Sequence, residues 1–171
     1  MSFITKRTRI DLIELKDIEA VRILHNEESV LFQLSDTTFI TPEMQKLWFV
    51  NLMKSSNSFR YVCRSLENND LIGVFRVDNF DMINKSAMIG LDVAVEFRRK
   101  GFAFEIYEFL IGYFLHTKKL HRLYLSTLET NLAAQALYAK LGFSIEGVQK
   151  EAIWRNGNYI NLINFSLISA L

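Results

Sequence analysis

The chain has 171 residues, 50% of them hydrophobic, and a formal net charge of +1 at pH 7. This size and composition are typical of one globular domain, so residues 1–171 are predicted to form a single domain. A net charge near zero provides no bulk attraction to nucleic acid or to a membrane surface, and neither is expected as a partner. The single cysteine, Cys63, excludes an intrachain disulfide and a cysteine-rich metal site, and no metal is expected.

Neither a secretory signal nor a membrane span is predicted. The first residues include several charges, and no apolar stretch of signal-peptide length follows them. No uncharged apolar run reaches the length of a transmembrane helix. A cytoplasmic protein in a reducing compartment is therefore expected.

Hydrophobic periodicity divides the chain into strands and helices joined by short turns. In chain order we expect a strand over 4–13, a helix over 17–25, a polar stretch over 26–40, a helix from 41, strands over 59–66 and 71–77, a strand over 86–95, a helix over 104–118, a strand over 122–128, a helix over 132–141, and strands over 143–155 and 158–168.

Local signals mark several of these boundaries. Thr41 and Pro42 predict a helix start, since a hydroxyl can cap a helix and proline suits its first position. Gly142 suits the left-handed position that commonly follows a helix. Asn156 and Gly157 predict a tight two-residue hairpin between the last two strands.

The order of the elements, β-α-α-β-β-β-α-β-α-β-β, indicates an α/β fold. It predicts a central mixed sheet of about seven strands with helices on both faces. The strands over 86–95 and 122–128 are expected to run parallel, because a helix crosses over between them.

A basic turn lies between the strand over 86–95 and the helix that follows it. Its sequence is Arg98-Arg99-Lys100-Gly101-Phe102-Ala103. The first N–H groups of a helix have no internal acceptor, and the helix dipole favours negative charge there. Gly101 lets the backbone approach a ligand closely. The turn is a candidate anion site, but many turns of this kind bind no ligand.

A second motif follows, Asn131-Leu132-Ala133-Ala134-Gln135-Ala136-Leu137-Tyr138-Ala139-Lys140-Leu141-Gly142-Phe143. The chain contains neither a G-x-x-x-x-G-K-[ST] loop nor a G-x-G-x-x-G loop, which argues against a nucleoside triphosphate or dinucleotide site. The basic turn fits [QR]-x-x-G-x-[GA], and the later segment fits N-x-x-A-x-x-L-Y-x-x-L-G-F. With both motifs in this order, the chain resembles the GNAT acyl-CoA-dependent N-acetyltransferases over about residues 87–167.

The resemblance implies the GNAT acyltransferase fold, in which the two central parallel strands splay apart, and acetyl-CoA as the co-substrate. It implies that the pantetheine arm lies along the end of the strand over 86–95, and that the pyrophosphate lies on the amides of 99–103. Arg99 stands where family members usually carry glycine. The cofactor-binding residues that it implies are Leu91, Val93, Ala94, Val95, Arg98, Arg99, Lys100, Gly101, Phe102, Ala103, Asn131 and Tyr138.

Tyr138 and Asp92 are the predicted catalytic residues. A phenol, with an ordinary pKa of about 10, can protonate the coenzyme A thiolate as it leaves, and the resemblance places Tyr138 at that sulfur. The general base is open between Asp92, near the splay, Glu129, at the end of the next strand, and a base that acts through ordered water. A backbone amide near Val93 is expected to stabilise the oxyanion.

The acceptor is expected to be a primary amine. The final hairpin resembles the RimJ/RimL-like branch, which acetylates protein N-termini, and the related polyamine and aminosugar acetyltransferases. The candidate walls of the acceptor site are His25, Asn26, Phe32, Trp48, Phe80 and Tyr159. Carboxylates that could form an acidic wall for a polyamine are Glu27, Glu28, Asp36 and Glu43.

The predicted function is therefore direct transfer of an acetyl group from acetyl-CoA to an amine in a ternary complex. The alternatives are an enzyme of the same fold that uses another acyl-CoA, and a non-catalytic module that binds coenzyme A as a sensor or pairs with a partner. The chain could also pair as a homodimer through an exposed sheet edge.

Overall fold

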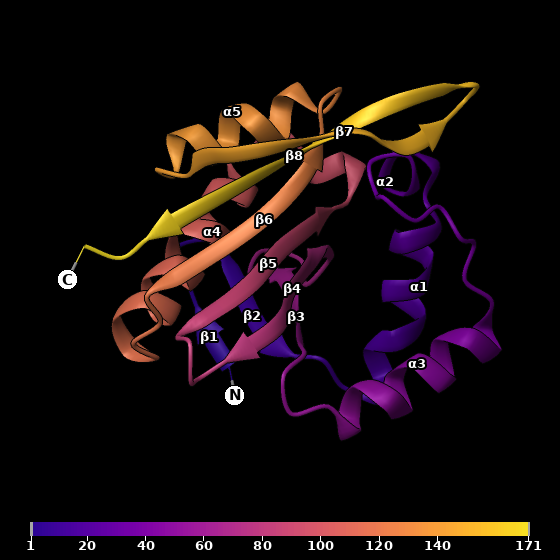
Figure 1. Cartoon of the computed structure of the whole chain (residues 1–171). Helices are drawn as coiled ribbons and strands as arrows, with labels where there is room; N and C mark the ends of the chain where they lie inside the picture. Colours follow the sequence, from indigo (N-terminus) through magenta and orange to yellow (C-terminus); the bar gives the residue numbers. More distant parts are fainter. Residues whose placement is uncertain (1, 171) are drawn as a thin grey trace.

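The structure, a computed structural model, describes residues 2–170. A mixed sheet forms its centre, with the strand order β1-β2-β3-β4-β5-β6-β8-β7 (Figure 1). The strands β5 and β6 are parallel, as predicted, and the other neighbouring strands are antiparallel. The strands are β1 (Ser2–Ile4), β2 (Thr8–Leu12), β3 (Phe59–Ser65), β4 (Leu71–Asp81), β5 (Ser86–Val93), β6 (Arg122–Leu128), β7 (Ser144–Arg155) and β8 (Asn158–Ile168).

Helices cover both faces of this sheet. They are α1 (Ile18–Asn26), α2 (Glu28–Leu31), α3 (Pro42–Lys54), α4 (Phe102–Gly112) and α5 (Leu132–Lys140). The predicted cap of α3 is present, since the Thr41 hydroxyl accepts a hydrogen bond from the Met44 N–H at 3.2 Å. The short α2 lies in the stretch over 26–40, for which the sequence predicts no element. Among residues 2–170, no helix is long and apolar enough to cross a membrane.

The sheet has eight strands rather than about seven, because β2 alone occupies most of the range predicted as a strand over 4–13, and the short strand β1 precedes it and pairs with it as a hairpin. The Thr5 N–H donates to the Thr8 carbonyl at 2.9 Å and closes the turn. The Arg7 N–H and guanidinium both donate to the Glu105 carboxylate of α4 at 2.8 Å. Because Glu105 is distant in the chain, its contact with this turn leaves no local signal. Hydrophobic periodicity alone therefore predicts one strand in this region.

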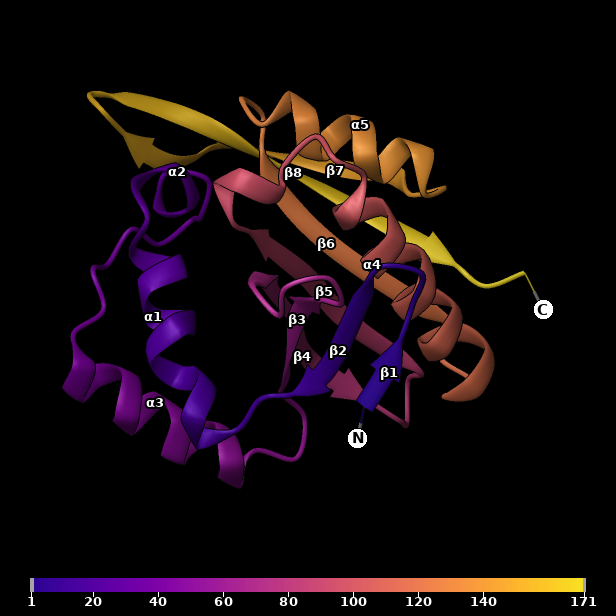
Figure 2. The same cartoon turned by 180° about the vertical axis from the view of Figure 1, so that it is seen from behind.

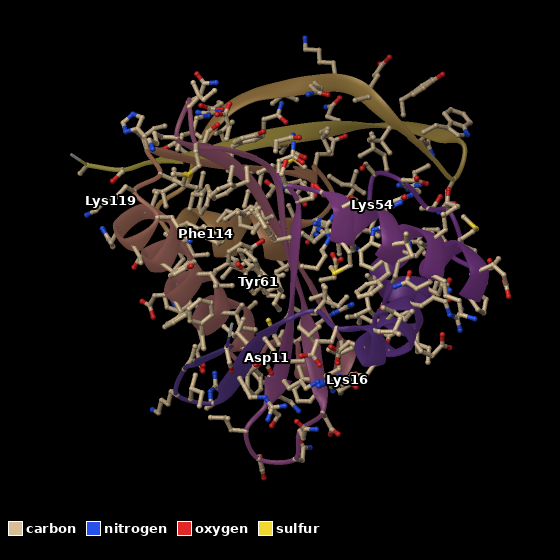
Figure 3. All side chains as sticks on the ribbon, turned by 90° about the horizontal axis from the view of Figure 1, so that it is seen from below. Asp11, Lys16, Lys54, Tyr61, Phe114 and Lys119 are labelled. Carbon is tan, nitrogen blue, oxygen red and sulfur yellow. The ribbon has the colours of Figure 1, made fainter. Side chains whose placement is uncertain are left out.

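Two apolar cores lie on opposite faces of the sheet. Helices α4 and α5 cover one face, and α1 and α3 cover the other (Figure 2). On the α4/α5 face, Tyr61 of β3 packs with Phe114, their ring centroids 6.5 Å apart. On the α1/α3 face, the neighbouring Val62 packs with residues of α1, α2 and α3. Figure 3 shows Tyr61 and Phe114 in the interior, whereas Lys119 lies at the periphery. Because side chains alternate between the two faces along a strand, neighbouring residues such as Tyr61 and Val62 pack in different cores.

The predicted splay between β5 and β6 is present. Their pairing is limited to Ser86 with Arg122, Ala87 with Leu123 and Met88 with Tyr124. Beyond these pairs, β5 remains bonded to β4 as far as Val93, and β6 remains bonded to β8 as far as Leu128. The two strands therefore diverge with one backbone edge each left open to a ligand.

Gly73 allows a close approach of β4 to β5 beside this splay. A Cβ atom at Gly73 would lie 2.2 Å from the Asp92 carbonyl oxygen, a backbone atom that cannot rotate away. We expect Gly73→Ala to destabilise the fold by about 3 kcal/mol, since extra atoms in a tightly packed site force the backbone to shift. Gly147→Ala is the matched control, because a Cβ at Gly147 meets nothing within 4 Å.

Thermal and urea unfolding of the two variants test this expectation. Equal stability of Gly73→Ala and Gly147→Ala would contradict the close approach of β4 to β5.

Candidate active site

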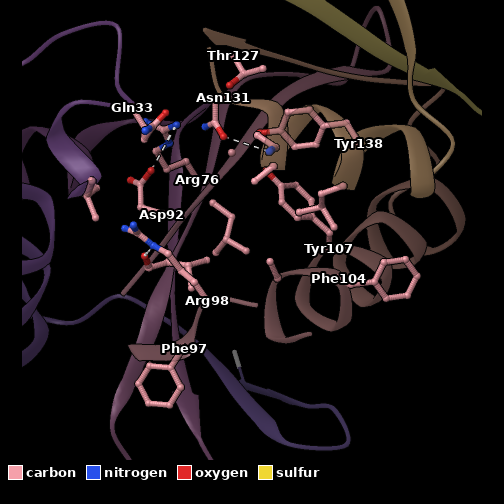
Figure 4. Close-up of a pocket in the computed structure, with 18 of the residues that line it drawn as sticks. Gln33, Arg76, Asp92, Phe97, Arg98, Phe104, Tyr107, Thr127, Asn131 and Tyr138 are labelled. Carbon is pink, nitrogen blue, oxygen red and sulfur yellow. Dashed lines mark hydrogen bonds and ion pairs between the residues drawn. The ribbon is translucent and has the colours of Figure 1, made fainter. Parts of the chain in front are cut away.

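A cavity of about 480 Å³ opens where β5 and β6 diverge (Figure 4). Ser29 of α2 and Gln33 line it on one side, and Tyr107 of α4 and Tyr138 of α5 line it on the other. These residues belong to elements on opposite faces of the sheet. The cavity therefore extends through the gap between the strands, and two molecules that approach from opposite faces can meet inside it.

The basic turn lies at the start of α4 and contributes to the cavity wall. Gly101 has φ 84°, the left-handed conformation that favours glycine, and Arg99 adopts it too, with φ 57°. The first hydrogen bond of α4 runs from the Glu105 N–H to the Gly101 carbonyl at 3.2 Å. The N–H groups of residues 102–104 precede it and have no acceptor within the helix, which is the arrangement that suits an anion.

Most of the predicted cofactor-binding residues line this cavity, namely Leu91, Val93, Arg98, Arg99, Gly101, Ala103, Asn131 and Tyr138. The other four lie outside its lining. Ala94 is buried in the core on the α1/α3 face, and Phe102 packs against the core on the α4/α5 face. Val95 and Lys100 are exposed, since β5 ends at Val93 and the chain turns outward there.

The end of β5 presents backbone groups to the splay. The Ala94 N–H donates to the Ile72 carbonyl at 2.9 Å, so it points toward β4. Because direction alternates along a strand, the N–H and carbonyl of Val93 point the opposite way, toward the gap. The Arg98 Nε donates to the Val93 carbonyl at 2.9 Å. Arg98 therefore holds the end of β5, while the Val93 N–H remains available in the gap.

Tyr138 is held in place by aromatic neighbours. Its ring centroid lies 5.9 Å from that of Tyr107, 6.0 Å from that of Phe143 and 5.5 Å from that of Phe165. The residue is only 8% exposed, and burial raises the pKa of its phenol above the ordinary 10.0. The phenol is therefore protonated at neutral pH and able to donate a proton.

Asn131 caps the helix that carries Tyr138. Its side-chain oxygen accepts a hydrogen bond from the Ala134 N–H at 3.1 Å, as the sequence predicts for a helix N-cap. Asn131 also lines the cavity, so the cap and the predicted contact with the cofactor are compatible.

Asp92 lies on the α1/α3 face of the sheet. It pairs across the strands with Val74, a member of the core on that face, so both side chains share it. Its carboxylate lines the cavity and lies 3.9 Å from the guanidinium of Arg76 (Figure 4). Strand alternation alone leaves open which face of the sheet Asp92 occupies, and the tertiary structure places it on the α1/α3 face.

Glu129, the other candidate base, is occupied elsewhere. Its two carboxylate oxygens accept hydrogen bonds from the Asn161 backbone N–H at 2.8 Å and from the Asn161 side-chain amide at 2.9 Å. It does not line the cavity. Glu129 therefore links β8 to the end of β6. The Asn161 amide can donate a hydrogen bond to the Glu129 carboxylate, whereas a second carboxylate at this position would repel it.

The predicted walls of the acceptor site, His25, Asn26, Phe32, Trp48, Phe80 and Tyr159, do not line the cavity. Asn26 instead exchanges two hydrogen bonds with the backbone of Ile40, at 2.8 and 2.9 Å. The carboxylates of Glu27, Glu28, Asp36 and Glu43 do not line it either, so they form no acidic wall there. The wall on this side consists of Ser29, Val30, Gln33 and Leu34.

Two lining residues of chemical interest are absent from the sequence-based predictions. Tyr107 is 1% exposed, and the Tyr138 hydroxyl is the polar group beside its own hydroxyl. Burial raises its pKa well above the ordinary value. Arg76 interrupts the apolar run of β4 between Phe75 and Val77, and this interruption is the signal that could have revealed it. Tyr107 carries no such signal, because a tyrosine on an apolar helix face resembles any core residue.

Cys63 has no part in the cavity. Its side chain is fully buried in the core on the α4/α5 face, and burial raises the pKa of its thiol. A thiol of this kind is a poor nucleophile, so the arrangement favours direct transfer over an acyl-cysteine intermediate.

Comparison with known proteins identifies the family. The profile of the acetyltransferase (GNAT) domain matches residues 10–163. The N-acetyltransferase YdaF of Bacillus subtilis (strain 168) is 29% identical over 103 residues, which cover 60% of this chain and 56% of that protein. The spermidine N(1)-acetyltransferase of Vibrio cholerae is 26% identical over 148 residues, which cover 86% of this chain and 84% of that protein.

A crystal structure of spermidine N-acetyltransferase from Vibrio cholerae in complex with CoA and spermine has the same fold. It superposes with a TM-score of 0.89 at 22% sequence identity and covers 94% of this chain and 95% of that chain. The family profile spans most of the chain, and the splay of β5 and β6 that the resemblance implies is present. The chain belongs to the GNAT family of acetyltransferases and is an acetyl-CoA-dependent N-acetyltransferase.

Proposed function

We propose that the protein acetylates a primary amine by direct attack on acetyl-CoA in a ternary complex. The observation that supports this proposal is one continuous cavity at the splay, lined by Tyr138, Asp92 and Val93 together. Acetyl-CoA would lie with its pyrophosphate on the turn over 98–103 and its pantetheine along the open edge of β5. The amine would enter from the side of α2.

The chemical step then follows from the positions of three groups. The amine nitrogen attacks the thioester carbonyl carbon after giving a proton to the Asp92 carboxylate, directly or through water. The Val93 N–H stabilises the oxyanion of the tetrahedral intermediate. The carbon–sulfur bond breaks, and the Tyr138 phenol gives its proton to the departing sulfur. The proton that the acetylated nitrogen still has to lose returns to the Tyr138 phenolate, directly or through water, and the products are the N-acetyl amine and coenzyme A.

Two acceptor classes fit the proposed reaction. Assignment to the RimJ/RimL-like branch would make the acceptor a protein N-terminal α-amine. The relatives named for spermidine would make it a small-molecule amine. A small molecule is favoured, because these relatives match 86% and 91% of this chain. We therefore place a small primary amine first and an N-terminal peptide second.

Calorimetry with acetyl-CoA, followed by a coenzyme A release assay over amines, tests the proposal. The amines are spermidine, an aminosugar nucleotide, N-terminal peptides and simple amino acids. We expect micromolar binding of acetyl-CoA and turnover with at least one small amine. Binding without turnover on any amine would contradict the catalytic proposal, and absence of binding would contradict the role of the turn over 98–103.

The pH dependence of turnover should reflect the raised pKa of Tyr138. The phenol must be protonated to act as an acid, and burial keeps it protonated up to a pH above the ordinary pKa of 10.0. We therefore expect no loss of kcat from this group between pH 7 and 9, as checked by a pH–rate profile with saturating substrates. A loss in this range that Tyr138→Phe abolishes would contradict the assignment.

A further inference from the structure

Arg76 of β4 has an environment unlike that of most other arginines of the chain. Arg22, Arg60, Arg64 and Arg98 donate hydrogen bonds to protein oxygens. For Arg76 no hydrogen bond to a protein atom is present within residues 2–170, and its one ion pair, with Asp92, is long at 3.9 Å. A guanidinium has five N–H donors, so most of the hydrogen-bonding capacity of Arg76 is unused.

The unused donors of Arg76 face the cavity. Arg76 lies across the strands from Gly90, and both residues line the cavity. Figure 4 shows the Arg76 side chain in this lining, beside Asp92. A Cβ atom at Gly90 would lie 2.7 Å from Arg76 Nη2 and 2.9 Å from Nε. The guanidinium therefore rests flat on the bare backbone of Gly90. The side chain is 37% exposed, and its place in the lining directs this exposure into the cavity.

The charges around the amine site are balanced rather than acidic. Within the described residues, Asp92 is the one carboxylate that lines the cavity, and Arg76 stands beside it. Asp92 raises the pKa of Arg76, so the guanidinium stays charged at neutral pH. A polyamine that placed one ammonium group at Asp92 would bring a second positive charge toward Arg76, and like charges repel.

We infer that Arg76 determines specificity by binding a carboxylate carried next to the reactive amine, so that the preferred acceptor is a small α-amino acid. This inference rests on the proposed function. The ammonium and carboxylate groups of an α-amino acid are bonded to the same carbon, and the neighbouring charges of Asp92 and Arg76 match them with opposite sign. Arg76 can hold a carboxylate through two parallel N–H donors, whereas Asp92 receives the ammonium proton.

Matched acceptors test the inference on the unmodified enzyme. Leucine, phenylalanine and serine are each compared with the corresponding amide and with the corresponding decarboxylated amine, and spermidine is added as the polycation. We expect kcat/KM for at least one acid to exceed that of its amide and of its amine by about 10-fold to 100-fold, the range of a charge-assisted hydrogen-bond pair. If no acid exceeds its own amide and amine, the inference is wrong.

Three variants distinguish a specific role of Arg76 in acceptor binding from general effects on the fold. Arg76→Gln should remove the preference for the acid, mainly by raising its KM, and leave the dissociation constant of acetyl-CoA unchanged. Gly90→Ala should weaken the preference while keeping the charge, because the new methyl group displaces the guanidinium. Arg9→Gln is the matched control, since Arg9 is 40% exposed, is paired with Asp11 and lies on β2, away from the cavity.

The two proposals fail in different ways. Turnover of spermidine or of an N-terminal peptide without preference for any acid would overturn the inference and leave the proposed acetyl transfer intact. Absence of turnover with every amine, despite binding of acetyl-CoA, would overturn both. An equal loss of rate on acids and amides in Arg76→Gln would assign Arg76 to the fold of the site rather than to specificity.

Discussion

Tyr138→Phe is expected to lower kcat by about 100-fold or more, the usual contribution of a positioned general acid. The substitution removes one oxygen atom and leaves the ring contacts with Tyr107, Phe143 and Phe165 in place. The thiolate of coenzyme A would then leave without a proton from the enzyme. Single-turnover kinetics and calorimetry check the expectation, since kcat should fall while the dissociation constant of acetyl-CoA stays the same.

Tyr61→Phe is the matched control for this variant. Tyr61 is also a buried tyrosine, 5% exposed, but it belongs to β3 and does not line the cavity. Its replacement should leave kcat within about twofold, because a residue remote from the reacting atoms affects turnover only through stability. An equal loss of rate in both variants would indicate an effect on packing, and a loss of affinity for acetyl-CoA in Tyr138→Phe would mean that the hydroxyl holds the cofactor.

Asp92→Asn is expected to lower kcat/KM for the amine by about 100-fold. An amide has the shape of the carboxylate but cannot accept the proton that the attacking amine must lose. It also leaves Arg76 without its ion partner, so the site becomes more positive and repels an ammonium group. Initial rates at several pH values measure the effect, and part of the lost rate should return at high pH, where more of the amine is already neutral.

Asp78→Asn provides the comparison for Asp92→Asn. Asp78 is likewise an aspartate of the central sheet paired with an arginine, Arg60, at 2.8 Å, but it lies outside the cavity. We expect this variant to lose some stability and to retain its turnover. Equal activity of Asp92→Asn and the unmodified enzyme would exclude Asp92 as the base and favour a base that acts through ordered water.

The likeness to a solved spermidine acetyltransferase shows the fold of this chain. The Vibrio cholerae enzyme shares the architecture of this chain at 22% identity. In this chain, however, the carboxylates that could attract a polyamine, Glu27, Glu28, Asp36 and Glu43, lie outside the cavity, and Arg76 lies inside it. Function depends on the residues of a site, and the same fold can serve different amines. The charges at this splay are the reason to test amino acids beside polyamines.

The sequence alone determined those features that depend on neighbouring residues. The basic turn, the cap at Asn131 and the helix that ends before Gly142 each combine residues within one or two turns of chain, and each is present in the structure. The parallel arrangement of β5 and β6 also followed from the sequence, because a helix between two strands forms a crossover that brings the second strand back in the same direction. The family resemblance rested on these same short segments.

The tertiary structure decided what depends on contacts between distant residues. Three contacts join residues far apart in the chain. They are the hydrogen bonds of Arg7 in the β1–β2 turn to Glu105, those of Asn161 to Glu129, and the bond of the Ala94 N–H to the Ile72 carbonyl, which turns Ala94 away from the cavity. The meeting of Arg76 with Asp92 depends on which residues face each other across β4 and β5. Hydrophobic periodicity predicts which side chains of a strand share one face of the sheet. Only the packing of helices on both sides of the sheet determines which of the two faces carries the catalytic residues.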